Sequence, residues 1–264
     1  MFNTSQVPRL ITISISHYCE KVRWALDWLK IPYVEESHAP PFHRLYTRRH
    51  GGTSVPVLVT ETDTFVDSTD ILHYLDTIAP EVNQLYPNQP ELRREVEKLE
   101  ELFDIKLGIS TRCWSYFYSL KQPDLIKKGW CTGVPWREKI GCAIAFPLMC
   151  RLVERGYNIT AEEAARSLQK IKTVFETVTE RLRSRPQRGA KRSGNEYLVG
   201  NNFSAADLTF AALASPVLRP VNHPIYSSSI KKFPLEVVEV IQELRKTPAG
   251  AFALRLYREN RCKN

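Results

Sequence analysis

The chain of 264 residues is 43% apolar, which is enough to bury the core of one large or two ordinary domains. It has no apolar run of the roughly 20 residues that span a bilayer and no N-terminal signal peptide, so we expect a cytoplasmic protein without a membrane partner. Its net charge of +8 comes largely from 185–192 and 255–263 without a nucleic-acid-binding motif, so we expect a solvated basic surface that attracts small anions, not nucleic acid.

Strand and helix patterns alternate in the first part of the chain. Isoleucines that alternate with polar residues predict a strand over 10–15, and apolar residues at helical spacing then predict a helix that Pro32 ends. A second strand is expected over 33–36. Residues 38–54 are rich in His, Arg, Pro and Gly, which predicts irregular structure with room for one short helix.

A hairpin and a helix complete this part. Residues 55–60 and 64–67 are β-prone and are joined by a short polar turn, which predicts a hairpin. Ser68 or Thr69 then caps a helix whose apolar residues share one face. The order of these elements, β-α-β, an irregular segment and β-β-α, predicts a small α/β domain over 1–80.

The rest of the chain has helical periodicity. Prolines mark a linker over 81–90, and an all-helical domain is expected over 91–264. Ser204 and Asp207 have the spacing of a capping box in front of an apolar run. Because the helix predicted over 205–214 is apolar on nearly every side, it should form the buried centre of this domain. Other amphipathic helices are predicted from 91 onward, over 161–183 and over 234–246.

The stretch SHYC places Ser16 and Cys19 three residues apart, where the first strand gives way to a helix. The spacing is that of a redox Cys-x-x-Cys pair, but oxygen replaces its first sulfur, so the pair has no dithiol cycle. A hydroxyl at a helix N-terminus, beside unpaired N–H groups and the positive end of the dipole, favours a bound thiolate. The alternative is that Ser16 only caps the helix, and this stretch alone leaves both interpretations open.

Two further positions offer groups to a ligand. If the Val55–Pro56 bond is cis, the backbone of Val55 turns outward and can pair with an extended peptide, although trans is the default. Asp67 and Ser68 open a helix N-terminus that can take a carboxylate, and Asp67 can take an ammonium group. Together these residues would recognise an α-amino acid head group, whereas alone they are an ordinary helix cap.

Four motifs resemble those of cytosolic glutathione transferases, in the same order and over nearly the whole chain: SHYCEKVRWAL, VPVL, DSTDIL and YLVGNNFSAADLTFAAL. The first is similar to a serine-type bacterial or cyanobacterial branch. The resemblance implies a thioredoxin-like N-terminal domain followed by an all-helical C-terminal domain. It also implies glutathione as co-substrate, no metal, a hydrophobic electrophile or a peroxide as second substrate, a role in detoxification, and a homodimer.

The resemblance implies a role for each site residue. Ser16 donates a hydrogen bond to the glutathione sulfur, as in the serine-type classes. Val55, ahead of a cis-Pro56, pairs through its backbone with the cysteinyl part of glutathione. Asp67 and Ser68 hold the γ-glutamyl group, with Asp at a position where many relatives have Glu.

Two parts of the chain depart from the family pattern. The segment RRHGGTS lacks the residues that often hold the glycine carboxylate of glutathione, so the candidates are His43, Arg48, Arg49 and Thr53. The segment 108–160 is long and aromatic, and its side chains either line an apolar substrate pocket or, more often for any single aromatic residue, pack in the core. They are Trp114, Tyr116, Phe117, Tyr118, Trp130 and Trp136.

Two other functions stay open. The same fold could bind glutathione, apolar ligands or another protein without turnover, or it could be a thiol reductase that uses Cys19 alone. The six cysteines match no zinc pattern, so we expect reduced and mostly buried thiols, with Cys19 packed and inert.

Overall fold

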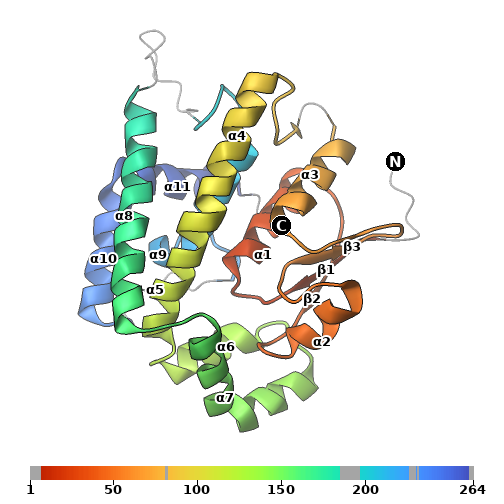
Figure 1. The fold of residues 1–264 in the computed structure, drawn as a ribbon, viewed down its shortest axis with the longest axis vertical. Helices are drawn as coiled ribbons and strands as arrows, with labels where there is room; N and C mark the ends of the chain where they lie inside the picture. Colours follow the sequence, from red (N-terminus) through yellow and green to blue (C-terminus); the bar gives the residue numbers. More distant parts are fainter. Residues whose placement is uncertain (1–6, 81–82, 185–196, 226–229, 231, 262–264) are drawn as a thin grey trace.

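The computed structural model describes residues 7–80, 83–184, 197–225, 230 and 232–261. In Figure 1 a small sheet and helices α1 to α3 lie on one side of the molecule, and the later helices form the other side and the lower end. The basic segment expected over 185–192 lies outside the described residues.

The sheet has four strands in the order β2-β1-β3-β4. β1 (Arg9–Thr12) runs parallel to β2 (Val34–Ser37) and antiparallel to β3 (Val57–Val59). β3 forms a hairpin with β4 (Thr64–Phe65). The predicted hairpin is therefore confirmed, with shorter strands than the sequence indicates.

The first strand also ends earlier than predicted. The chain leaves β1 after Thr12, and the N–H of Ser16 donates to the carbonyl of Ile13 at 2.9 Å, which closes a turn. Ile13 and Ile15 belong to this turn and line a cavity. The predicted strand is longer than the observed one because the alternating pattern continues through the turn.

Three helices accompany the sheet: α1 (His17–Trp28), the short α2 (His43–Thr47) and α3 (Ser68–Ile78). The cap of α3 is Asp67, whose carboxylate accepts from the N–H of Thr69 at 2.8 Å. Of the caps that the sequence offers, Asp67 is the one observed and Ser68 and Thr69 are not, because a carboxylate reaches the free N–H groups of a first turn as well as a hydroxyl does.

A long helix begins the second part. α4 (Pro90–Leu102) passes through a π-helical segment (Phe103–Gly108) into α5 (Ile109–Ser119). Such segments change the hydrogen-bond pattern within a helix and are frequent at functional sites. The helices that follow are α6 (Pro123–Cys131), α7 (Trp136–Gly156), α8 (Ala161–Ser184), α9 (Ala205–Leu218), α10 (Leu235–Lys246) and α11 (Pro248–Glu259).

Helix α9 is the buried centre that the sequence predicts, because all its residues are buried. The predicted capping box is confirmed, with the carboxylate of Asp207 accepting from the N–H of Ser204 at 2.9 Å. One apolar core surrounds α9 and continues to Trp24 of α1 and Leu58 of β3. The chain thus has a thioredoxin-like α/β part and an all-helical part that share a core.

Buried ion pairs also connect the two parts. The ammonium of Lys21 on α1 lies 2.8 Å from a carboxylate oxygen of Glu100 and 2.7 Å from one of Asp104. Near the end of the described chain, Arg261 is buried and forms ion pairs with two carboxylates of α1. The expectation of a solvated basic tail is therefore wrong for Arg261.

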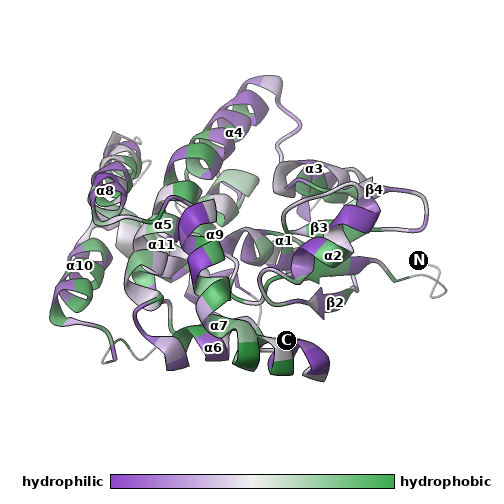
Figure 2. Ribbon diagram, turned by 60° about the horizontal axis from the view of Figure 1, so that its bottom comes forward, coloured by the Kyte–Doolittle hydropathy of each residue, from purple (hydrophilic) through white to green (hydrophobic). Residues whose placement is uncertain are grey.

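Helix α7 presents apolar side chains to the outside. Figure 2 brings α6 and α7 forward and shows hydrophobic stretches along α7. Among the described residues, no helix combines the length and the apolar character that crossing a membrane requires. The exposed apolar residues of α7 recur every four positions: Trp136, Ile140, Ile144, Leu148 and Leu152.

Candidate functional site

Two cavities of about 570 Å³ each adjoin where loops of the sheet part face the α4–α5 helix. We call them the Ser16 cavity and the Asp67 cavity, after a residue that lines each. A ligand that crosses their common boundary would reach both. The residues that line both cavities are Tyr18, Ser54, Val55 and Arg112.

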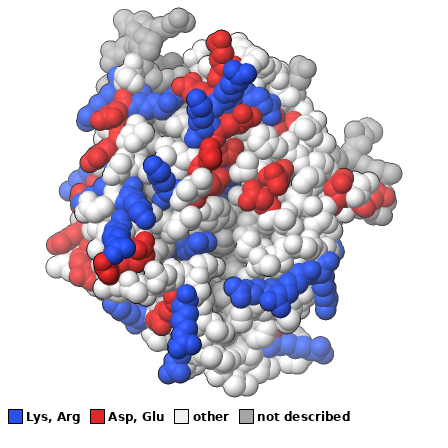
Figure 3. Space-filling view, in the orientation of Figure 1, with Lys and Arg blue, Asp and Glu red and all other residues white. Residues whose placement is uncertain are grey.

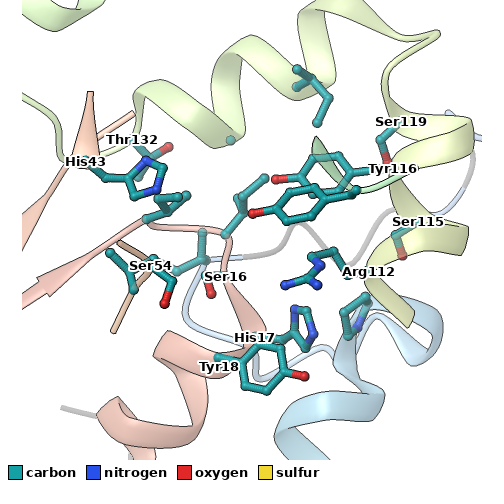
Figure 4. Close-up of a pocket in the computed structure, with 18 of the residues that line it drawn as sticks. Ser16, His17, Tyr18, His43, Ser54, Arg112, Ser115, Tyr116, Ser119 and Thr132 are labelled. Carbon is teal, nitrogen blue, oxygen red and sulfur yellow. The ribbon is translucent and has the colours of Figure 1, made fainter. Parts of the chain in front are cut away.

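Ser16 is half-buried at the N-terminus of α1 and lines its cavity (Figure 4). Its hydroxyl oxygen accepts from the backbone N–H of Cys19 at 3.3 Å, so Ser16 does cap the helix. Accepting this bond leaves the hydroxyl proton for donation to another group. A thiolate beside it would also face the positive end of α1. The cap and the thiol-activating role are therefore compatible.

The Val55–Pro56 peptide bond is cis, as the family resemblance implies. Pro56 is buried and lines the Asp67 cavity, while Val55 lines both cavities. The paired part of β3 starts only at Val57, and no backbone hydrogen bond joins Val55 to another described residue. The N–H and C=O of Val55 are thus left for a ligand that lies along this edge.

Asp67 and Ser68 line the Asp67 cavity at the start of α3. Asp67 is exposed, and one of its oxygens is occupied by the N–H of Thr69, which leaves the other oxygen for an ammonium group. Ser68 is buried beside the N–H groups of the first turn, which favour a carboxylate. The structure therefore brings Val55, Pro56, Asp67 and Ser68 to one cavity and Ser16 to the adjoining one.

Residues next to Ser16 tie α1 to the π-helical segment. The hydroxyl of Tyr18 donates to the carbonyl of Asp104 at 2.6 Å, and the Nε2 of His17 lies 2.8 Å from the carbonyl of Gly108. Burial lowers the pKa of His17 to about 3, and the charge of Arg112 adds to the shift, so the ring is neutral and Nε2–H is the donor. A Cβ at Gly108 would lie 2.3 Å from the Tyr18 hydroxyl, so this contact requires glycine.

The two cavities carry opposite charges. Among the described residues, five carboxylates and one arginine line the Asp67 cavity, whereas four Lys or Arg side chains and no Asp or Glu line the Ser16 cavity. Figure 3 shows the same trend outside, with mainly Lys and Arg over α2. The basic residues are Arg44, Arg112, Lys128 and Arg219, and the acidic ones are Asp67, Glu97, Glu100, Glu101 and Asp104.

The candidates for the glycine carboxylate divide into two groups. His43 and Thr53 line the Ser16 cavity, whereas Arg48 and Arg49 line neither cavity. Burial lowers the pKa of His43 to about 4, so its side chain is neutral near pH 7. Arg44, which the sequence analysis overlooked, lines the Ser16 cavity beside His43 and is the cation that α2 supplies there.

Of the six aromatic candidates in 108–160, Tyr116 alone lines either of these two cavities. Trp114 and Trp130 pack in the cores, and Trp136 is 66% exposed. Tyr157 lines the Ser16 cavity as well and was missed. No periodic signal marks it, because it follows the end of α7 and reaches the cavity only through the fold.

The described cysteines are free thiols: Cys19, Cys113, Cys131, Cys142 and Cys150. Burial raises the pKa of Cys19 to about 11, although Arg23 and the Ser16 hydroxyl oppose the shift. A buried and protonated thiol is a poor nucleophile, which counts against a thiol reductase that uses Cys19. Within the described ranges, no group of three or more His, Cys, Asp or Glu side chains could hold a metal ion.

Comparisons with known proteins agree with this architecture. Residues 10–83 match the N-terminal domain family of glutathione S-transferases. No curated protein matches the sequence. The chain therefore carries a glutathione S-transferase N-terminal domain.

Solved structures are similar to the whole chain. A glutathione S-transferase of Ceriporiopsis subvermispora in complex with glutathione has a TM-score of 0.62 at 16% identity, over 98% of this chain and 99% of its own. The beta-etherase LigF from Sphingobium sp. strain SYK-6 has a TM-score of 0.57 at 18% identity, over 94% and 99%. A glutathione S-transferase from Methylobacterium radiotolerans in complex with glutathione sulfonate has a TM-score of 0.53 at 20% identity, over 94% of both chains. Both parts of the chain thus have the glutathione S-transferase fold.

Proposed function

We propose that this protein is a serine-type glutathione transferase. It would stabilise the glutathione thiolate through Ser16 and join it to a hydrophobic electrophile, or reduce a peroxide with two glutathione molecules. The observation that carries the proposal is the Ser16 hydroxyl at the N-terminus of α1, which lines the same cavity as Val55, whose backbone forms no hydrogen bond with another described residue. Relatives with this fold hold glutathione or glutathione sulfonate, which supports the same ligand here.

Glutathione would lie across both cavities. Its γ-glutamyl ammonium group would pair with Asp67, and its γ-glutamyl carboxylate with Ser68 and the first turn of α3. The cysteinyl backbone would pair with Val55, which places the sulfur at Ser16. The glycine carboxylate would then point toward α2, where Arg44 supplies a positive charge.

The chemistry needs a thiolate, because the thiol of free glutathione is a weak nucleophile near pH 7. A hydrogen bond donated by Ser16 and the dipole of α1 both stabilise the charged sulfur, and together lower its pKa by about one to two units. The protein also holds the sulfur next to a second substrate in the Ser16 cavity, which lowers the entropic cost of their reaction.

The test is the thiolate absorbance of bound glutathione against pH, in the wild type and in Ser16→Ala. We expect a pKa at least one unit below that of free glutathione, and loss of the shift in the variant while binding persists. Thr247→Ala is the matched control, because Thr247 caps α11 in the same way but lines neither cavity. If bound glutathione titrates as it does in solution, the protein binds glutathione without activating it, and the proposal fails.

Three further parts of the proposal concern the whole molecule. We propose domains over 1–80 and 91–264 with a linker over 81–90, and a homodimer in which the N-terminal domain of one protomer contacts the helical domain of its partner. A reducing compartment such as the cytoplasm fits five described free thiols and a substrate that must stay reduced. Light scattering of the full chain would test the dimer, and a monomer at micromolar concentration would contradict it.

A further inference from the structure

The charge of the Ser16 cavity is unexplained by glutathione alone. If Arg44 binds the glycine carboxylate, three other cations still line the same cavity, and no Asp or Glu is among its lining residues. One of the three, Arg112, also lines the acidic Asp67 cavity. Like charges gathered in one cavity cost free energy unless a counter-charge joins them. The three cations are Arg112, Lys128 and Arg219, of which Arg219 already has other contacts, including the ring of Phe233 at 4.8 Å from its guanidinium carbon.

Arg112 is the most informative of these cations. It is half-buried on α5, and no ion pair joins it to a carboxylate among the described residues. Two buried arginines elsewhere, Arg23 and Arg261, differ from it, since each lies within 3.0 Å of carboxylate oxygens. The Arg112 guanidinium instead lies 4.1 Å from the ring centroid of Tyr157. It is thus held in place by an aromatic face, with its N–H groups left for an anion.

The rest of this face of α5 offers hydrogen-bond donors. Arg112, Ser115, Tyr116 and Ser119 follow at i, i+3, i+4 and i+7, and all four line the Ser16 cavity. The hydroxyl of Ser115 is buried and has no partner among the described residues. Figure 4 shows Arg112 between Tyr116 and His17, with its guanidinium on the side of the cavity where Ser16 lies.

We propose that the second substrate is an aromatic electrophile that carries an anionic group, such as a carboxylate. Its anion pairs with Arg112 and the α5 hydroxyls, its ring lies against Tyr116 and Tyr157, and its electrophilic carbon faces the sulfur at Ser16. This inference rests on the proposed function, because it assigns the substrate of that same site. For an aryl halide, the thiolate attacks the ring carbon, the new C–S bond forms, and halide leaves with the electron pair of the broken bond.

Two probes of equal shape test the charge requirement: 4-chloro-3,5-dinitrobenzoate and its neutral carboxamide. We expect wild-type kcat/KM, corrected for the uncatalysed rates, to favour the carboxylate by about tenfold or more, because a charge-assisted pair is worth this much. Arg112→Gln should bring the ratio near one through a higher KM for the carboxylate, with the KM for glutathione unchanged. Arg166→Gln is the control, because Arg166 is an exposed arginine of α8 that lines neither cavity.

Each result decides between the proposals. Equal use of both probes by the wild type overturns the anionic substrate and leaves the transferase proposal intact. If Arg112→Gln raises the KM for glutathione and affects both probes equally, Arg112 serves glutathione and the inference is wrong. If neither probe reacts, calorimetry with 3,5-dinitrobenzoate and its carboxamide in the presence of S-methylglutathione still compares the two, and tighter binding of the carboxylate supports the inference. Should Arg112→Gln not fold, Arg112→Lys keeps the charge and is expected to retain part of the preference.

Discussion

Substitution Lys21→Met tests whether the ion pairs between α1 and the α4 helix hold the two parts together. The ammonium of Lys21 is fully buried, within 3.0 Å of the carboxylates of Glu100 and Asp104, whose side chains are 1% and 18% exposed. Methionine fills the same space without the charge, so two carboxylates would face each other inside the protein. Breaking a buried pair in this way costs about 3–5 kcal/mol.

The loss should depend on pH in a definite direction. Burial alone would lower the pKa of Lys21, but the charges of Glu100 and Asp104 outweigh burial and raise it. The stabilising contribution of Lys21 is therefore complete at every pH below its unfolded pKa, which includes the whole range from pH 5 to 8. Burial raises the pKa of Asp104, and Lys21 opposes this shift. In Lys21→Met, Asp104 loses the charge that opposes the rise of its pKa, so it is expected to take up a proton as the pH falls, which relieves the repulsion. The stability gap to the wild type should therefore be largest at pH 8 and narrow toward pH 5.

Urea unfolding followed by circular dichroism at both pH values measures this gap. At pH 8 we expect a loss of about 3–5 kcal/mol, which corresponds to a melting temperature lower by roughly 6–20 °C for a chain of this size. Lys172→Met is the control, since it removes an exposed ion pair with Glu243 and should cost less than about 1 kcal/mol. A loss at Lys21 no greater than that of the control, or a gap that stays constant with pH, would refute the reasoning.

Other predictions concern single contacts around the site. Gly108→Ala should weaken glutathione binding and lower stability, because the new Cβ would lie 2.3 Å from the Tyr18 hydroxyl and displace it. Isothermal titration would measure the binding, and thermal melting the stability. His17 has a pKa of about 3 in the folded chain, below its unfolded value, so its contribution to stability is complete above pH 6.5 and falls as the pH drops toward 3. His17→Gln should therefore make stability, measured by urea unfolding, less sensitive to acid. Cys19 should react with a thiol reagent at pH 7 far more slowly in the native than in the unfolded protein, because burial raises its pKa to about 11. Arg261→Met should destabilise the chain by about 1–3 kcal/mol, because it removes a charged hydrogen-bond donor from Glu20 and Asp27 while Glu20 keeps its ion pair with Arg23, whereas an unchanged melting temperature would speak against the ion pairs.

Local patterns predicted most of the fold. The helix of Ile71 and Leu75, the hairpin, and the capping box at Ser204 are each encoded within about a dozen neighbouring residues, and the structure confirms them. The errors lie where a pattern continues beyond its element or where a tertiary contact decides. Ile15 alternates as a strand residue but lies in the turn, and Arg261 resembles a solvated basic tail but pairs with α1.

The residues proposed to bind glutathione could be predicted from the sequence, whereas those proposed to bind the second substrate could not. Ser16, Val55 and Asp67 each sit at the end of a strand or helix, so a short motif places them, and the structure brings them to adjoining cavities. Arg112 and Tyr157 belong to segments 45 residues apart and meet only in the folded chain, and neither stands in a motif. Their chemistry could be inferred only after the cavity was known.

The π-helical segment explains why the sequence does not predict which residues of α5 line the Ser16 cavity. Each residue of an α-helix turns the chain by about 100°, so one residue added within a π turn rotates every later side chain by that angle about the helix axis. The segment Phe103–Gly108 therefore sets which face of α5 meets the cavity, and bonds from His17 and Tyr18 hold its carbonyls in place. Since those two residues directly follow Ser16, the turn that presents the Ser16 hydroxyl also holds the helix that carries Arg112. If the proposed function holds, the alignment of glutathione and the second substrate depends on this one junction between the two parts of the fold.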